Sequence, residues 1–583
     1  MSNRLKGLGF SLVWNGYVVV SYYVPILAWV MAYFRHSFSN PLPWQGDHVN
    51  FYYNEVIANP DPIPGEIVDG SVARYTEYTG TGLLGETVSW CAFTWFIVWI
   101  CMYKGVGITG RVVYFTMGLP VVTMIILLGR GVSLPNATDG IRLYMATWRG
   151  ELLGDRYIWQ MACGQIFFSI GLGMGYFTSY ASYNNQHQNV VQDVLIIIVC
   201  NSLYEIVGCF AVFGIIGFLQ QFPQPGDDPI GSFAIAFLTY PAGVAEMPGA
   251  QFWSFLFFFT IMILGFSSAF ALQDTLVTMI MDAEFARNWN RIYVSSTSVV
   301  ISFLISLIFC TEFGYYLLDA VDSWINNMSL LFVVWCECIA ATTIYRHKDV
   351  VGLVGWPAYI VFNVGYIGGQ LFGCVVGSVT YSRSWDGIWR PDSAPPSFWK
   401  KNVWLEKTYY LGVYSGLQLT RDLNLVVATG KNWSIPFYWG FVIRYCSAPI
   451  LGIVFSLGYP AFAAVRYDPL QIFGFIVGHL SMLIIAFGLV FPRMMDVFIP
   501  VERRGEGEIP FSPNLAVASA ELSIGQRLEV GEETDARSDI MDPDRDKRQT
   551  SGRGEGFSPV EDELGMSEKK QTGPGDRPLR DKW

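Results

Sequence analysis

Long apolar runs constrain the fold of this sequence more than any other feature. Hydrophobic residues make up 52% of the 583 residues and charged residues only 15%, which is too apolar for one soluble core. A bilayer crossing needs about 20 mostly apolar residues. We find eleven candidate segments: 8–34, 90–106, 112–129, 158–182, 194–219, 252–281, 293–310, 325–345, 351–380, 435–462 and 470–491. The sequence therefore predicts an all-α polytopic protein with the lipid bilayer as a partner, and we expect no nucleic-acid partner.

Lysine and arginine in the short loops predict the orientation, because cytoplasmic loops carry an excess of these residues. Basic residues near 4–6, 104–111, 287–291 and 346–348 alternate in a way that places the N-terminus inside. The loop 130–157 is an exception, since it carries four arginines on the predicted outer side. We expect a plasma-membrane protein with a cytoplasmic C-terminus.

The ninth apolar segment conflicts with this orientation. If 351–380 crossed the membrane, the basic stretch 382–434 would lie outside, and the segment is also rich in glycine. We therefore predict ten transmembrane helices plus one re-entrant or interfacial segment, with an inserted cytoplasmic region at about 351–434 inside a membrane domain of residues 1–501. Residues 502–583 are charged and poor in apolar side chains, which predicts a disordered cytoplasmic tail.

The run "GQIFFSIGLGMGYFTSYASY" (164–183) contains three glycines in five residues at its centre. Glycine costs about 0.8–1 kcal/mol relative to alanine in a helix interior, and the bilayer offers no water to freed backbone groups. Two explanations are open. The small residues allow a neighbouring helix to approach closely, or the helix is discontinuous and its exposed half-helix ends bind substrate and ions, as in secondary transporters.

The same run resembles the sixth helix of the neurotransmitter:sodium symporters, and other motifs follow in the family's order. "VVVSYYVPILAW" (18–29) resembles the third helix, "LGFSSAF" (264–270) the eighth and "IPFYWGFVIRYCSAPILGIVF" the eleventh, so that the resemblance extends from Gly9 to Arg504. The basic insertion is similar to the fungal branch. The resemblance implies an inverted-repeat, leucine-transporter-like fold that lacks the family's first two helices. A truncated gene model, an incomplete isoform and a degenerate member all remain possible.

The resemblance also implies a site. The residues that match substrate-binding positions are Val19, Tyr23, Phe168, Gly171, Gly173, Met174, Ser268 and Leu272. Those that match sodium ligands are Ser169 and Asn201 for one ion, and Leu264 (through its carbonyl), Ser267 and Ser268 for the other. Na⁺ prefers hard oxygen donors, as other hard cations do. Without the resemblance, each aromatic is more simply explained by packing and each serine by a hydrogen bond to its own helix.

Two acidic residues complete the implied site. Glu205 lies one helical turn after Asn201 and occupies the position where chloride-independent members carry a glutamate, so that it would substitute for chloride. Asp322 matches the acidic half of an extracellular gate whose arginine belongs to the first helix. Because that arginine is absent from this sequence, we expect Asp322 to be hydrated.

The resulting hypothesis is a transporter rather than an enzyme. It would couple Na⁺ entry to uptake of a small amino-acid-like solute by alternating access, with Na⁺ as the co-transported ion and no organic cofactor. We expect the chain as given to show no concentrative uptake, and a version with two further helices to show it. A non-transporting membrane sensor or scaffold is the leading alternative, and a glycine-broken channel is a third. The sequence does not indicate the oligomeric state.

Overall fold

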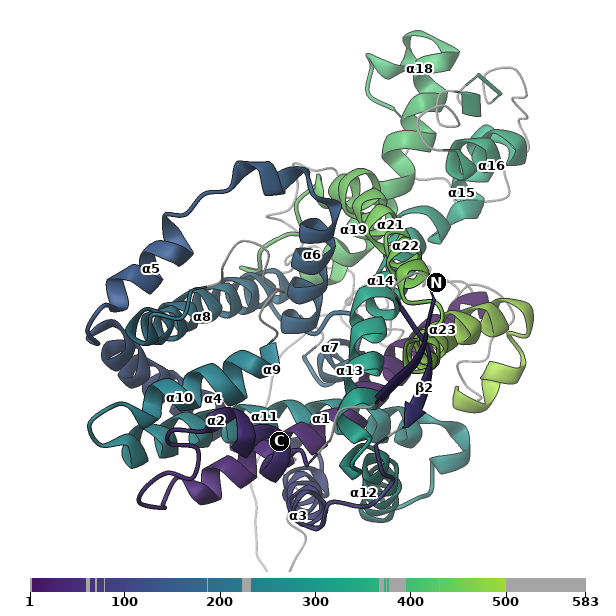
Figure 1. Ribbon diagram of the computed structural model, residues 1–583. Helices are drawn as coiled ribbons and strands as arrows, with labels where there is room; N and C mark the ends of the chain where they lie inside the picture. Colours follow the sequence, from purple (N-terminus) through teal and green to yellow (C-terminus); the bar gives the residue numbers. More distant parts are fainter. Residues whose placement is uncertain are drawn as a thin grey trace, which may run out of the picture.

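The structure, a computed structural model, describes residues 3–58, 63–68, 71–77, 79–185, 187–222, 232–365, 372–373, 375–376, 395–428 and 430–499 (Figure 1). The tail predicted for 502–583 lies outside these residues. The described chain is mostly helical, which confirms the predicted fold class.

Nine helices within the described residues are long and apolar enough to cross a membrane. They coincide with nine of the predicted segments. Their bounds are α1 (Lys6–His36), α3 (Gly85–Met102), α4 (Val106–Val132), α8 (Val190–Leu219), α11 (Ala250–Asp282), α12 with η6 (Arg291–Cys310), the run α13–η7–α14–η8 (Gly314–Ile344), the run α20–η12–α21–α22 (Trp439–Ala464) and α23 (Pro469–Val490). Within these runs, η6 is Leu307–Cys310, α13 is Gly314–Trp324, η7 is Ile325–Ser329, α14 is Leu330–Ile339 and α21 is Ala448–Ser456.

A tenth predicted segment, 158–182, is a broken helix. Its first half is α6 (Arg156–Ile170) and its second half is α7 (Tyr176–Ala181). Residues Gly171–Gly175 between them are not helical, and we call them the unwound segment. Of the two explanations for the central glycines, the structure confirms the discontinuous helix.

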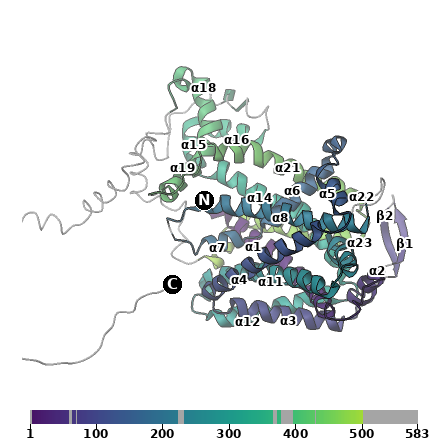
Figure 2. The same ribbon diagram turned by 90° about the vertical axis from the view of Figure 1, so that its left-hand side faces the viewer.

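The ninth predicted segment does not form one long helix in its described part. It begins with α15 (His347–Val354) and α16 (Trp356–Val364), which are 8 and 9 residues long and are separated at Gly355, where φ is +85°. Neither helix is long enough to cross a bilayer. They share a small hydrophobic core with η11 (Tyr409–Tyr414), and Figures 1 and 2 show that this region projects away from the bundle together with α18 (Val403–Thr408).

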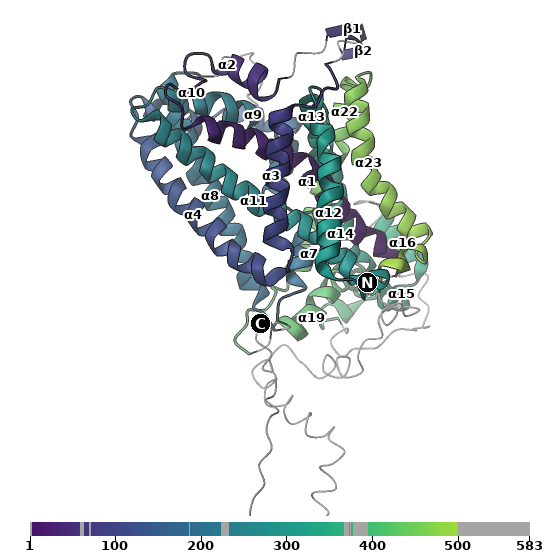
Figure 3. The same ribbon diagram turned by 90° about the horizontal axis from the view of Figure 1, so that it is seen from below.

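The connections carry shorter elements, and one of them is a β-hairpin that the sequence analysis does not predict. Strands β1 (Ile63–Val68) and β2 (Ser71–Glu77) pair antiparallel. The other short elements include α2 (His48–Asn50), α5 (Ala137–Met145), α9 (Ser232–Ala234), α10 (Tyr240–Ala245) and α19 (Ser415–Val427). Figure 3 shows the hairpin and α2 at one end of the bundle, and α15, α19 and the start of α1 at the opposite end.

Helix α1 lies at the centre of the fold. Most of its residues are buried, and it packs along α11, α3 and α23. The largest hydrophobic core contains side chains from α1, α3, α11 and α13, and also Met174 from the unwound segment. The break in the helix therefore lies inside the bundle and faces α1 and α11.

Candidate functional site

The three glycines of the unwound segment have a backbone conformation that other residues rarely adopt. Gly171, Gly173 and Gly175 have φ values of +78°, +80° and +82°, where a Cβ atom costs about 1–2 kcal/mol. Near Gly171 the Tyr176 hydroxyl donates to the carbonyl of Ile170 over 2.6 Å, so that one backbone group released by the break is satisfied within the segment. The glycines are thus required by the backbone path.

Helix α1 holds the other side of the break. The side-chain amide of Asn15 donates to the carbonyl of Gly173 at 3.3 Å. One residue later, a Cβ atom on Gly16 would lie 2.5 Å from the carbonyl oxygen of Met174, so that only glycine permits this approach. The break is therefore clamped against α1 by one hydrogen bond and one close backbone contact.

The residues predicted to contact a solute gather around this clamp. Val19, Met174 and Leu272 are buried in the same hydrophobic core, and Tyr23 and Phe168 pack against it. The phenol of Tyr23 also lies within hydrogen-bonding reach of Ser268 on α11. The structure therefore brings together residues from α1, the broken helix and α11 that are far apart in the sequence.

The first predicted ion site forms a compact polar group, which we call the carboxylate cluster: Ser169, Asn201 and Glu205. The Asn201 amide donates to Ser169 Oγ at 3.0 Å and to Glu205 Oε1 at 3.1 Å, and the Ser169 hydroxyl donates to the same carboxylate oxygen. Ser169 and Asn201 are half-buried and Glu205 is exposed. The cluster thus places three polar side chains from α6 and α8 beside the unwound segment.

The second predicted ion site lies within one turn of α11. Ser267 Oγ donates to the carbonyl of Leu264 at 2.7 Å and Ser268 Oγ to the same oxygen at 3.4 Å. All three predicted ligands therefore meet. In this arrangement the hydroxyls bond to their own helix, as isolated serines in helices commonly do.

Asp322 is not hydrated as expected. It is half-buried in α13, where Oδ1 accepts a hydrogen bond from the Tyr22 hydroxyl at 2.6 Å and another from Asn326 at 3.0 Å. The expectation of hydration rested on the missing arginine alone, whereas a tyrosine of α1 reaches the carboxylate in the fold. Asp322 thus joins α13 to the helix that carries Tyr23.

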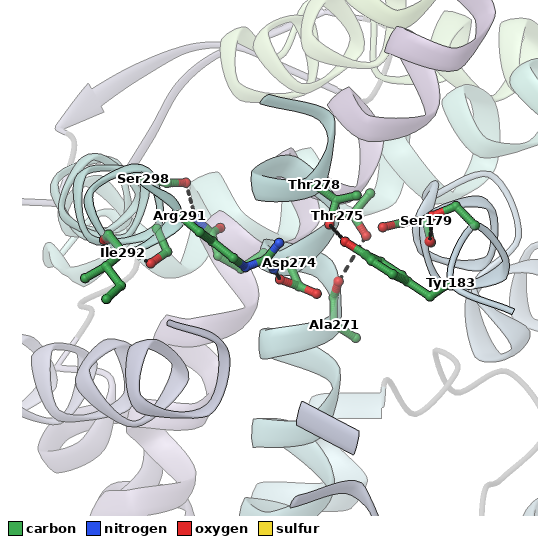
Figure 4. Close-up of polar contacts among 12 residues, drawn as sticks. Ser179, Tyr183, Ala271, Asp274, Thr275, Thr278, Arg291, Ile292 and Ser298 are labelled. Atoms are coloured by element: carbon green, nitrogen blue, oxygen red, sulfur yellow. Dashed lines mark hydrogen bonds and ion pairs between the residues drawn. The ribbon is translucent and has the colours of Figure 1, made fainter. Parts of the chain in front are cut away.

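A second polar group, which is not among the predicted site residues, lies near the C-terminal end of α11. Asp274 has no exposed side-chain surface and forms an ion pair with Arg291 at the start of α12. Figure 4 shows these two side chains pointing toward one another, and Tyr183 toward Thr278, whose oxygens are 3.3 Å apart. The signal was available, because an aspartate inside an apolar run of 33 residues is costly and commonly functional.

A cavity of about 330 Å³ lies between the unwound segment and this end of the bundle. Gly175 and Ser179 line it on the side of the broken helix, Thr275 and Asp282 on α11, and Val13 on α1. The cavity therefore extends from the unwound segment toward the end of the bundle at which α1 begins.

Comparison with known proteins identifies relatives of this chain. Residues 76–363, just under half of the chain, match the sodium:neurotransmitter symporter family. Sodium- and chloride-dependent GABA transporter 2 from Homo sapiens is 33% identical over 383 residues, which is 60% of this chain and 63% of the relative. The Macaca fascicularis protein of the same name is 32% identical, with 60% and 62% covered.

The creatine transporter of Torpedo marmorata is similar to the same degree. It is 32% identical over 378 residues, covering 60% of this chain and 61% of the relative. The chain therefore spans less than two thirds of the length of these relatives. Their names describe transporters of two different small solutes.

Proposed function

We propose that the chain is a member of the sodium:neurotransmitter symporter family, that it has the leucine-transporter-like inverted-repeat fold, and that it takes part in sodium-coupled symport of a small amino-acid-like solute. The family match and the relatives support this proposal. The basic insertion supports placement in the fungal branch. The observation that carries the proposal is the carboxylate cluster beside a helix break inside the bundle.

The cluster can exchange an internal hydrogen-bond donor for a cation. The NH₂ group of Asn201 now bridges Ser169 and Glu205. If the amide turned over, its oxygen would take the place of its nitrogen, and three side-chain oxygens would converge where the donor had been. An Na⁺ ion accepts such hard ligands, and its charge would neutralise the carboxylate of Glu205. Ser267, Ser268 and the Leu264 carbonyl would hold a second ion if both hydroxyl hydrogens turned away from that carbonyl.

The solute would lie between α1, the unwound segment and α11. Tyr23 and Ser268 offer hydroxyls, whereas Val19, Phe168, Met174 and Leu272 offer apolar walls. The relatives are named for GABA and creatine, which are small solutes that carry both a carboxylate and a cationic group. These two compounds and the common amino acids are therefore the first probes to use.

Several residues of the proposed site are exposed, which argues against a complete transport cycle by the 583-residue chain. Glu205 and Ser268 are exposed, and Ser169 and Asn201 are half-buried. Alternating access requires a site that can be closed on each side. We infer that this chain on its own binds Na⁺ without concentrating solute, and concentrative uptake by reconstituted protein would contradict this part of the proposal.

We also propose that the chain lies in a plasma membrane with its C-terminus on the cytoplasmic side, and the two ends of the bundle support this orientation. The region containing α15 and α19 lies at the end where α1 begins, and the hairpin lies at the other end. Basic residues concentrate in the former region, as expected for a cytoplasmic face. Asp322, held by Tyr22, would contribute to closing the opposite, outer side.

The decisive experiment measures sodium binding by thermal unfolding of the purified chain in lipid nanodiscs. We expect NaCl to raise the unfolding temperature more than KCl does, and Asn201→Ala to remove the difference. Ser202→Ala is the matched control, because Ser202 is the next residue of α8 and is exposed outside the cluster. Equal effects of the two salts on the parent would contradict the proposal.

A second arm separates a transporter from a sensor or scaffold. GABA, creatine and amino acids are added with and without Na⁺. A further stabilisation that requires Na⁺ supports a coupled solute site. A sodium effect without any solute effect favours the non-transporting sensor.

A further inference from the structure

The unwound segment is connected to two distant helices by a line of buried polar side chains, which we call the relay: Asn15, Ser329 and Ser481. They lie on α1, at the end of η7 and on α23, and none has exposed surface. Ser329 Oγ lies 2.7 Å from Asn15 Oδ1 and 2.6 Å from Ser481 Oγ. The Asn15 amide nitrogen lies 3.3 Å from the carbonyl oxygen of Gly173.

Hydrogen-bonding capacity fixes the direction of the relay. A carbonyl oxygen only accepts, so Asn15 must present its NH₂ group to Gly173 and its oxygen to Ser329. Ser329 must therefore donate its one hydroxyl hydrogen to Asn15. Ser481 Oγ lies 3.0 Å from the Gly478 carbonyl oxygen of its own helix and 2.6 Å from Ser329 Oγ, and the shorter contact is a hydrogen bond only if Ser481 donates to Ser329. The resulting direction is Ser481 to Ser329 to Asn15 to the Gly173 carbonyl, and each link has a donor and an acceptor. Such a satisfied buried chain rigidifies the groups that it joins.

Packing makes the end of the relay specific. On the α14 side, a Cβ atom on Gly173 would lie 3.2 Å from both Leu330 and Val334, and on the α1 side Gly16 meets the carbonyl of Met174. The peptide groups around Gly173 therefore lie between two helices. The Asn15 hydrogen bond selects the direction in which the Gly173 carbonyl points.

We propose that Asn15 is a positioning residue, which through Ser329 and Ser481 sets the conformation of the unwound segment. Displacement of α23 or η7 would change the Gly173 carbonyl without any contact with a bound ion or solute. The consequence for ligand affinity rests on the proposed function. The effect on the unwound segment does not.

The test is hydrogen–deuterium exchange by mass spectrometry on the full chain in nanodiscs. In Asn15→Leu, which keeps the number and branching of the side-chain heavy atoms but has no hydrogen-bonding groups, we expect amide exchange in residues 171–175 to rise about tenfold, the value for loss of roughly 1.4 kcal/mol from a buried hydrogen bond. Exchange in α3 and α12 should stay unchanged. Ser21→Ala is the matched control, because Ser21 is also buried on α1 and its hydroxyl, the group that the substitution removes, donates to the Tyr17 carbonyl of the same helix.

Two results would overturn the proposal: unchanged exchange at 171–175, or an equal rise throughout the bundle, which would mean general loss of stability. If Asn15→Leu does not fold, Ser481→Ala decides. It removes the first donor and leaves Asn15 in place, and we expect a smaller rise of about threefold confined to 171–175. An unchanged value in Ser481→Ala would then contradict the relay.

Sodium dependence separates this inference from the proposed function. If the parent responds to Na⁺, Asn15→Leu should raise the Na⁺ concentration needed for half-maximal stabilisation, and Ser21→Ala should not. If the parent shows no sodium response but exchange at 171–175 still rises, the proposed function is wrong and the positioning role stands.

Discussion

Two polar groups flank the same helix break, and they differ in burial and charge. The relay of Asn15, Ser329 and Ser481 is neutral and has no exposed surface. The carboxylate cluster of Ser169, Asn201 and Glu205 contains a charge and is partly exposed. One group bonds the backbone of the unwound segment, whereas the side chains of the other bond one another.

The difference in burial and charge indicates different roles: the relay supports the unwound segment, whereas the carboxylate cluster is suited to bind an ion. A buried neutral chain in which every group is paired is costly to disrupt and gains nothing from a ligand. A partly exposed carboxylate held by two neutral donors can exchange a donor for a cation. We therefore expect substitutions in the relay to act mainly on stability, and substitutions in the cluster to act mainly on the response to ions.

The largest effect should come from the break on which both groups depend. A Cβ atom on Gly171 would lie 1.6 Å from the Tyr176 hydroxyl oxygen, and its φ is +78°. We expect Gly171→Ala to expel that hydroxyl and to destabilise the protein by about 3 kcal/mol or more, since conformational strain and a lost hydrogen bond add. Thermal unfolding in nanodiscs measures the change.

Gly9→Ala is the control for this substitution. Gly9 is in α1, and an added Cβ would meet nothing within 4 Å. Alanine has the higher helix propensity, so Gly9→Ala should be neutral or stabilising by up to about 1 kcal/mol. Equal stability of both variants would show that the break tolerates other backbone paths.

The second prediction compares hydroxyls in the relay and outside it. Ser329→Ala should cost about 1–3 kcal/mol, because it leaves the Asn15 oxygen buried without a donor. Ser267→Ala on α11 should cost less than about 1 kcal/mol, since its hydroxyl bonds a carbonyl of its own helix. Their unfolding temperatures in sodium-free buffer provide the comparison, and the reverse order would contradict the assignment of support to the relay.

The central glycines left two explanations open and the resemblance favoured the break, but neither indicated what holds the break in place. Three glycines in an apolar run weaken a helix where the membrane requires one, and few structures satisfy both conditions. The resemblance identified Ser169, Asn201 and Glu205 as residues beside the break. Asn15 carried no such signal. Its role depends on Gly173, Ser329 and Ser481, which are 158 to 466 residues further along the chain and meet only through packing of α1 against α14 and α23.

The errors have the same origin. Asp322 was assessed against one missing arginine, whereas Tyr22, 300 residues away, reaches it in the fold. The predicted segments place Asp274 in a helix and Arg291 in the following loop. In the fold, the turn between α11 and α12 brings the two side chains together as an ion pair. The β1–β2 hairpin lies in a connection with no hydrophobic periodicity to identify it.

The third prediction tests whether the cluster responds to ions independently of the relay. A ligand at 100 times its dissociation constant stabilises the folded state by about 2.7 kcal/mol. We expect Ser169→Ala to lower this sodium stabilisation by about 1 kcal/mol or more, as expected for one lost ligand, and to change the sodium-free stability by less than about 0.5 kcal/mol. Ser329→Ala should instead lower the sodium-free stability by about 1–3 kcal/mol and should reduce the sodium stabilisation less than Ser169→Ala does, because it acts on the ion site only through the unwound segment. Identical patterns in the two variants would remove the distinction between support and binding.

The smallest expected effect concerns chloride, and for the parent it is no effect. The relatives are named as chloride-dependent transporters, whereas Glu205 places a fixed negative charge within 3.1 Å of the Asn201 amide. A bound anion beside that carboxylate would be repelled, so replacing chloride with gluconate should leave the sodium stabilisation of the parent unchanged.

In Glu205→Ser the fixed charge is gone, and a cation in the cluster would need a mobile anion instead. We therefore expect this variant to need chloride for its sodium stabilisation, with about a tenfold higher sodium requirement in gluconate, the equivalent of roughly 1.4 kcal/mol. Glu205→Gln, which keeps the size but removes the charge, should behave like the serine variant if charge is the cause. Loss of the sodium response of the parent in gluconate would show that Glu205 does not replace chloride.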